Sequence, residues 1–142
     1  MKRSEVFEQV KETLIETLGL EEGEEITPQS NLIGDLGAES IDFLDIMARL
    51  ERRLDITLDT SGEEVENAIR DLVSEEELET GIIPPELLAR LPELIPEIDP
   101  SRFTDDLRLH EIPLLYTVDS MIKLVVRELE SQQNVKVEND MG

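Results

Sequence analysis

The 142-residue chain contains no cysteine, and aromatic residues make up only 3% of it. The absence of cysteine excludes disulfide bonds, thiol catalysis and cysteine-ligated zinc. There is a single histidine, His110, and no calcium-loop motif, so we expect no catalytic centre and no metal site. Because aromatic residues are so few, aliphatic side chains must supply nearly all the packing of a core.

Basic residues are scarce, with 13 Lys and Arg against 35 Asp and Glu, which gives a net charge of −22. This balance opposes binding to nucleic acid or to an anionic membrane and favours partners with basic surfaces. The sequence has no apolar run long enough to span a bilayer, and it begins with charged residues instead of an apolar signal segment. We therefore expect a monomer in the cytoplasm, without stable membrane insertion.

Apolar residues recur at helical spacing, which predicts an all-α fold. The pattern indicates helices over residues 4–18, 40–54 and 118–130, with Ser4 as the N-cap of the first. The polar tail, residues 132–142, is expected to be frayed.

A long loop, residues 21–37, separates the first two helices. A loop of this length is uncommon without structure of its own in a compact domain. We expect its apolar residues to tie it to the core, and these are Ile26, Leu32, Ile33 and Leu36.

The middle of the chain, residues 60–115, differs from the rest. A stripe of apolar residues predicts a helix over 63–78, capped by Thr60 or Ser61. Six of the seven prolines then fall between positions 84 and 113, which excludes a long helix there and favours short helical turns. We expect one domain, with a core of about 4–59 and 116–131 and a helical, proline-rich insertion over 60–115.

The segment 35–42, Asp-Leu-Gly-Ala-Glu-Ser-Ile-Asp, delivers Ser40 to the start of a helix after a glycine-bearing turn. Such a place suits a phosphate ester, because free backbone N–H groups and the positive end of the helix dipole lie there. From spacing alone, a simple capping role for Ser40 is the more common explanation.

The same residues resemble the acyl carrier protein family, whose modification site reads Gly-Ala-Asp-Ser-Leu-Asp where this chain has Gly37-Ala38-Glu39-Ser40-Ile41-Asp42. Residues 26–32 resemble the loop between the family's first two helices, and 116–118 resemble the start of its last helix. The resemblance implies a four-helix bundle, here with the insertion in place of the short third helix.

The resemblance also implies a covalent 4′-phosphopantetheine on Ser40, added by a phosphopantetheinyl transferase, and a non-catalytic acyl carrier for fatty-acid or specialised lipid synthesis. No base is apparent near Ser40, and a serine without a positioned base is a poor nucleophile, so a separate enzyme is needed. Expected partners are acyl chains and synthetase, ketosynthase or acyltransferase enzymes with basic patches.

The acidic residues around the predicted second helix match positions at which the family presents carboxylates to its enzymes. This chain departs from the family at Glu39, which replaces Asp, and in the basic residues near the end of that helix. We expect partner recognition by Asp35, Glu39, Asp42, Asp45, Glu51, Arg52 and Arg53.

In this family the apolar helical stripes also line the pocket for the acyl chain. The residues expected in the core and pocket are Phe7, Val10, Leu14, Ile33, Leu36, Ile41, Leu44, Met47, Leu50, Val118, Met121, Ile122 and Val125. Two alternatives stay open: an aminoacyl or peptidyl carrier of nonribosomal synthesis, and an unmodified, carrier-like interaction protein in which Ser40 only caps a helix.

Overall fold

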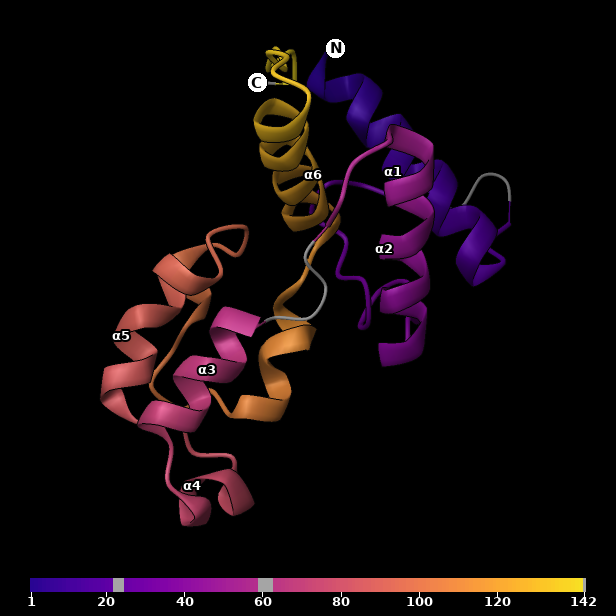
Figure 1. Cartoon of the computed structure of the whole chain (residues 1–142). Coiled ribbons are helices and arrows are strands. Elements are labelled where there is room, and N and C mark those ends of the chain that lie inside the picture. Colours follow the sequence, from indigo (N-terminus) through magenta and orange to yellow (C-terminus); the bar gives the residue numbers. More distant parts are fainter. Residues whose placement is uncertain (22–24, 59–62, 142) are drawn as a thin grey trace. The chain divides into compact units, whose positions relative to one another are not determined.

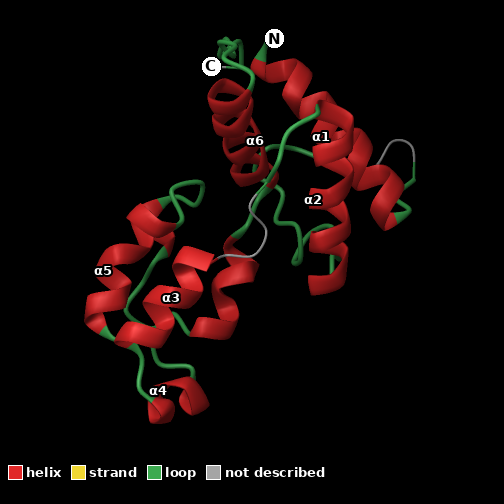
Figure 2. Cartoon of the chain, viewed as in Figure 1, coloured by secondary structure: helices red, strands yellow, loops and turns green. Residues whose placement is uncertain are grey.

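A computed structural model describes residues 1–21, 25–58 and 63–141 (Figure 1). For Ser40, Glu63, Glu64 and Pro113 it describes the backbone and not the side chain. The regular structure in these ranges consists of helices connected by loops (Figure 2). Three isolated β-bridges also occur there, and none of them extends into a strand. The predicted all-α fold is thus confirmed. The chain divides into two compact units, unit 1 (residues 1–60 and 116–142) and unit 2 (residues 61–115).

Unit 1 contains three α-helices: α1 (Arg3–Leu18), α2 (Ser40–Leu54) and α6 (Val118–Gln132). Helix α1 packs against both α2 and α6 (Figure 1). The core between them is aliphatic, as expected from the composition, and burying each such side chain contributes about 1.5–3 kcal/mol. Its fully buried members include Val6, Val10, Leu14, Leu32, Ile46, Leu50, Val118, Met121, Ile122 and Val125.

The two ends of the chain are joined in unit 1. The prediction that Ser4 caps α1 is wrong, because Lys2 occupies the N-cap position and Ser4 lies within the first turn. Instead, the Asp140 carboxylate accepts hydrogen bonds from the Ser4 backbone N–H (2.9 Å) and hydroxyl (2.6 Å). The Arg3 N–H also donates to the Glu138 carbonyl, at 2.7 Å, and Val137 is buried in the core. The expectation of a frayed tail is therefore wrong for Val137, Glu138 and Asp140, which are bonded to the start of α1 or buried in the core.

The buried face of α2 differs from the predicted one. Ile41 and Leu44, both expected in the core, are 72% and 55% exposed, whereas Ile46 is fully buried. Ile41 precedes Leu50 by about two and a half helical turns, so the two side chains point to opposite sides of the helix. A spacing of three residues falls short of a full turn, and the predicted stripe therefore drifted around the helix.

The loop before α2 is tied to the core, as expected, and it also bonds to the start of α6. Ile26 and Leu32 are buried in the core. The Leu32 N–H donates to the Tyr116 carbonyl (3.1 Å), and the Val118 N–H donates to the Ser30 carbonyl (3.0 Å). The second bond satisfies the Val118 N–H, one of the donors that a helix N-terminus otherwise leaves unpaired.

Unit 2 contains α3 (Glu63–Leu72), α4 (Glu75–Thr80), α5 (Pro85–Leu94) and two 3₁₀ helices, η1 (Pro100–Arg102) and η2 (Leu109–Leu115). Helix α3 packs against α5 (Figure 1). Unit 2 has apolar buried side chains of its own, which are Ala68, Val73, Ile83, Leu87, Leu91, Ile95, Ile98 and Leu107.

The predicted helix over 63–78 is interrupted at Ser74. The Ser74 hydroxyl accepts from the Glu77 N–H (3.2 Å), and the Glu77 carboxylate accepts from the Ser74 N–H (3.0 Å). This reciprocal capping box starts a second helix, α4, in place of a continuation of α3. The predicted caps of the first helix, Thr60 and Ser61, lie outside the described residues.

Candidate functional site

Ser40 is the first residue of α2 and not its N-cap. Glu39 holds the N-cap position in extended backbone geometry, and its N–H donates to the Asp42 carboxylate at 2.9 Å. Gly37 has a φ of 74°, a left-handed conformation that glycine adopts without a steric penalty. The interpretation of Ser40 as a helix cap is therefore wrong.

The start of α2 fits a covalently attached group. A serine hydroxyl can form the phosphodiester by which phosphopantetheine is linked, and the neighbouring side chains of Glu39 and Ile41 are exposed. A Cβ built on Gly37 would meet nothing within 4 Å, so the turn before the helix is also open. Negative charge at a helix N-terminus is stabilised by the helix dipole.

Most of the acidic residues expected to recognise partners also hold local structure. The Asp35 carboxylate accepts from the Asn31 N–H at 2.7 Å, and Glu51 accepts from the Leu58 N–H at 3.1 Å. Asp42 closes the turn at Glu39 as described above. Asp45 forms an ion pair with Arg49 one turn along α2, at 3.2 Å. Asp35, Glu39 and Asp45 are exposed, whereas Asp42 and Glu51 are partly buried.

The two arginines near the end of α2 have different surroundings. Arg53 bridges to α1, where it pairs with Glu12 (2.9 Å) and Glu16 (2.7 Å). Arg52 is exposed and forms no ion pair within the described ranges. Of the two, Arg52 is therefore the one whose charge is available to another molecule.

The other expected pocket residues lie in or against the core of unit 1. Met47, Leu50 and the four α6 residues are buried, and so are Val10 and Leu14 of α1. Phe7, Ile33 and Leu36 are partly buried and pack against this core.

The sequence pattern did not predict an apolar surface next to Ser40. Ile41 and Leu44 lie on the exposed side of α2, between acidic residues at positions 39, 42 and 45. A helical wheel drawn through Ile46 and Leu50 would have separated these two residues from the core. The pattern did not predict a role for Phe43 either, whose ring packs edge-on against Tyr116 with centroids 5.1 Å apart.

Comparison with known proteins identifies the family. The family described as phosphopantetheine attachment site matches residues 8–61. An acyl carrier protein of Thermotoga maritima is 34% identical over 79 residues, which cover 56% of this chain and 96% of that protein. No solved structure matches the chain.

These matches confirm the acyl-carrier-like fold and phosphopantetheine as the cofactor of the matched domain. They support a non-catalytic carrier role that involves acyl chains and partner enzymes in general. No helix in the described ranges is long and apolar enough to cross a membrane. The chain therefore belongs to the acyl carrier protein family.

Proposed function

We propose that Ser40 carries the phosphopantetheine arm, and that the chain shuttles acyl groups between enzymes of fatty-acid synthesis or of a specialised lipid pathway. The observation that supports this most is the position of Ser40. It is the first residue of α2, directly after Glu39, which takes over the capping position that would otherwise explain a serine there. When bound, the arm supplies a thiol that holds an acyl group as a thioester.

A phosphopantetheinyl transferase would place the arm on Ser40. The exposed Ile41 and Leu44 side chains and the carboxylates between them form a mixed face beside the attachment residue. An apolar contact surrounded by negative charge suits an enzyme surface with a basic rim around an apolar depression. Charge of this kind mainly accelerates and orients the encounter, which suits a carrier that must also be released.

The family and the aliphatic core of unit 1 support an acyl chain as the cargo. Aliphatic side chains of α1, α2 and α6 would have to part to admit an acyl chain among them. Each buried methylene would contribute about 0.8 kcal/mol, so a chain of about eight carbons has a substantial gain available. The expected partners are synthetase, ketosynthase or acyltransferase enzymes, and we place the carrier in the cytoplasm with them.

The attachment can be tested directly by intact-mass spectrometry. The apo protein is incubated with coenzyme A and a broad-specificity phosphopantetheinyl transferase, and fragmentation of the product locates the added mass. We expect one phosphopantetheine on Ser40 and none on the Ser40→Ala variant. Ser30→Ala, which changes a serine in the preceding loop, serves as the matched control and should be modified like the natural protein.

Modification at another residue, or its absence with several transferases, would contradict the proposal and favour an unmodified interaction protein. If the arm is added, loading with fatty acids and with amino acids separates the two kinds of carrier. Efficient loading with amino acids alone would indicate the aminoacyl alternative.

A further inference from the structure

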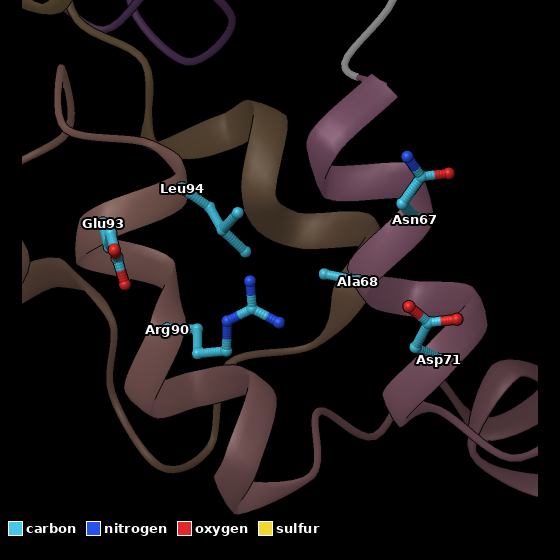
Figure 3. Close-up of a pocket in the computed structure, with 6 residues that line it drawn as sticks. All are labelled: Asn67, Ala68, Asp71, Arg90, Glu93 and Leu94. Carbon is cyan, nitrogen blue, oxygen red and sulfur yellow. The ribbon is translucent and has the colours of Figure 1, made fainter.

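A polar pocket lies between α3 and α5 in unit 2, with a volume of about 360 Å³ (Figure 3). Asn67, Ala68 and Asp71 of α3 face Arg90, Glu93 and Leu94 of α5 across it. Residues three and four apart lie on the same face of a helix, so each helix presents one continuous strip to the pocket.

Arg90 extends from α5 toward α3, and its guanidinium lies below the Leu94 side chain in this view, on the side of α5 that faces Ala68 (Figure 3). Ala68 is buried, and its small side chain leaves room for the guanidinium. No described residue forms an ion pair or a side-chain hydrogen bond with Arg90, Asp71 or Glu93. The pocket thus holds positive and negative groups that are not paired with one another.

Asn67, unlike these charged groups, already has a side-chain hydrogen bond. Its side-chain oxygen accepts a hydrogen bond from Arg70, which lies outside the pocket. The amide N–H₂ of Asn67 therefore remains as a further donor. The pocket combines donors at Arg90 and Asn67, acceptors at Asp71 and Glu93, and an apolar wall at Leu94.

We propose that this pocket binds a small zwitterion of the α-amino acid class. The carboxylate of the ligand accepts hydrogen bonds from the Arg90 guanidinium, whose planar fork matches a carboxylate. Its ammonium group donates to the Asp71 carboxylate, and its side chain lies against Leu94 and Ala68. A ligand with only one of the two charges leaves part of the pocket unmatched, and the two carboxylates repel a simple anion.

The volume is at the lower end of the range for small-molecule sites, which agrees with a ligand of this size. Because Asp71, Arg90 and Glu93 are exposed to solvent, we expect weak binding, with a Kd on the order of 1 mM. The site lies within unit 2, and the inference does not depend on the role of Ser40.

The test is a titration of the full-length protein with L-leucine, followed by the backbone amide signals of residues 67–71 and of Arg90, Leu91, Glu93 and Leu94 in NMR spectra. Leucinamide, which lacks the carboxylate, and N-acetyl-leucine, which lacks the ammonium group, are titrated under the same conditions. We expect saturable shifts with leucine and at least about tenfold weaker binding of both blocked compounds.

The Arg90→Gln and Asp71→Asn variants should each weaken leucine binding by about tenfold. Arg108→Gln removes the same charge from unit 2 outside the pocket and should leave binding unchanged. Circular dichroism shows whether each variant is folded, and Asp71→Asn keeps the test decisive if Arg90→Gln is not. Absence of saturation, equal binding of the blocked compounds, or an equal effect of Arg108→Gln would overturn the proposal.

Discussion

Arg53, at the end of α2, donates to the Glu16 carboxylate of α1 at 2.7 Å and to the Glu12 carboxylate at 2.9 Å. The Gln9 side-chain oxygen accepts a further hydrogen bond from it, at 3.1 Å. A single guanidinium thus joins three successive turns of α1 to α2. In a chain of net charge −22, this bridge also neutralises carboxylates that would otherwise repel one another.

Removal of the Arg53 guanidinium should loosen the packing of α1 on α2. For Arg53→Ala we expect a loss of about 1 kcal/mol in the free energy of unfolding, because several contacts of one network are lost together. The loss should shrink in high salt. Urea unfolding measures it. Arg52→Ala, which removes an equal charge without a bridge, should change stability by less than about 0.5 kcal/mol, and equal losses would disprove the role of Arg53.

Ile46 and Ile41 are the same residue type on α2 but differ in burial, so substitutions of the two separate stability from docking. Ile46 is fully buried and Ile41 is 72% exposed, so Ile46→Ala should cost about 2–5 kcal/mol and Ile41→Ala about 0.5 kcal/mol or less. Ile41→Ala should instead lower kcat/KM of the phosphopantetheinyl transferase, because Ile41 adjoins Ser40. Thermal unfolding and the modification rate measure the two effects. An unchanged modification rate would show that Ile41 takes no part in docking.

Arg52 is positioned to influence the choice of partner. We expect Arg52→Glu to change the relative rates with which different acyltransferases and ketosynthases accept the loaded carrier, since rim charges act chiefly on association. Arg53→Glu should act mostly through stability, because its natural contacts lie within unit 1. Rates measured at two salt concentrations separate these effects. Identical rates with every enzyme would argue against recognition through Arg52.

Acid should weaken the hydrogen bonds between Asp140 and Ser4. The hydrogen bond from the Ser4 hydroxyl, followed by that from its backbone N–H, lowers the pKa of Asp140 below its ordinary value. A lowered pKa in the folded state means that this contribution is complete above about pH 4, near the ordinary aspartate value, and is lost as the pH falls through the folded pKa.

The Ser4 and Asp140 amide signals in NMR spectra report this weakening. In the Asp140→Asn variant the acid-dependent change at Ser4 should disappear. Asp106, whose pKa is lowered by the Thr104 hydroxyl in unit 2, is the internal reference and should titrate in the same way in both proteins. A Ser4 signal that still shifted in the variant would assign the change to another group.

Helical periodicity and the apolar content of the long loop were sufficient to predict the three helices of unit 1 and the attachment of Leu32 to its core. The rotation of α2 was not predicted, because Ile41 and Leu44 satisfy a spacing of three residues as well as core residues do. Nothing in local sequence could show that Asp140 would bond to Ser4, since that contact depends on the two ends of the chain meeting.

Within the candidate site, the motif around Ser40 predicted the position of the serine at a helix start. It did not predict that Glu39 and Asp42 would form the cap between them, because only Ser40 itself was considered for the N-cap position. The end of the predicted helix at Ser74 could have been predicted from the sequence. Ser74 and Glu77 stand three residues apart, as a capping box requires, but the apolar stripe before them extended the predicted helix too far.

The bonds from residues 28–32 to the start of α6 bear on the order in which the protein forms during synthesis. Helix α6 supplies Val118, Met121 and Ile122 to the core of unit 1, and all of unit 2 precedes it in the sequence. A ribosome has therefore made every residue of unit 2 before unit 1 can close. Until then the apolar faces of α1 and α2 lack the third helix of their core, and transiently exposed apolar surface of this kind promotes aggregation and chaperone binding.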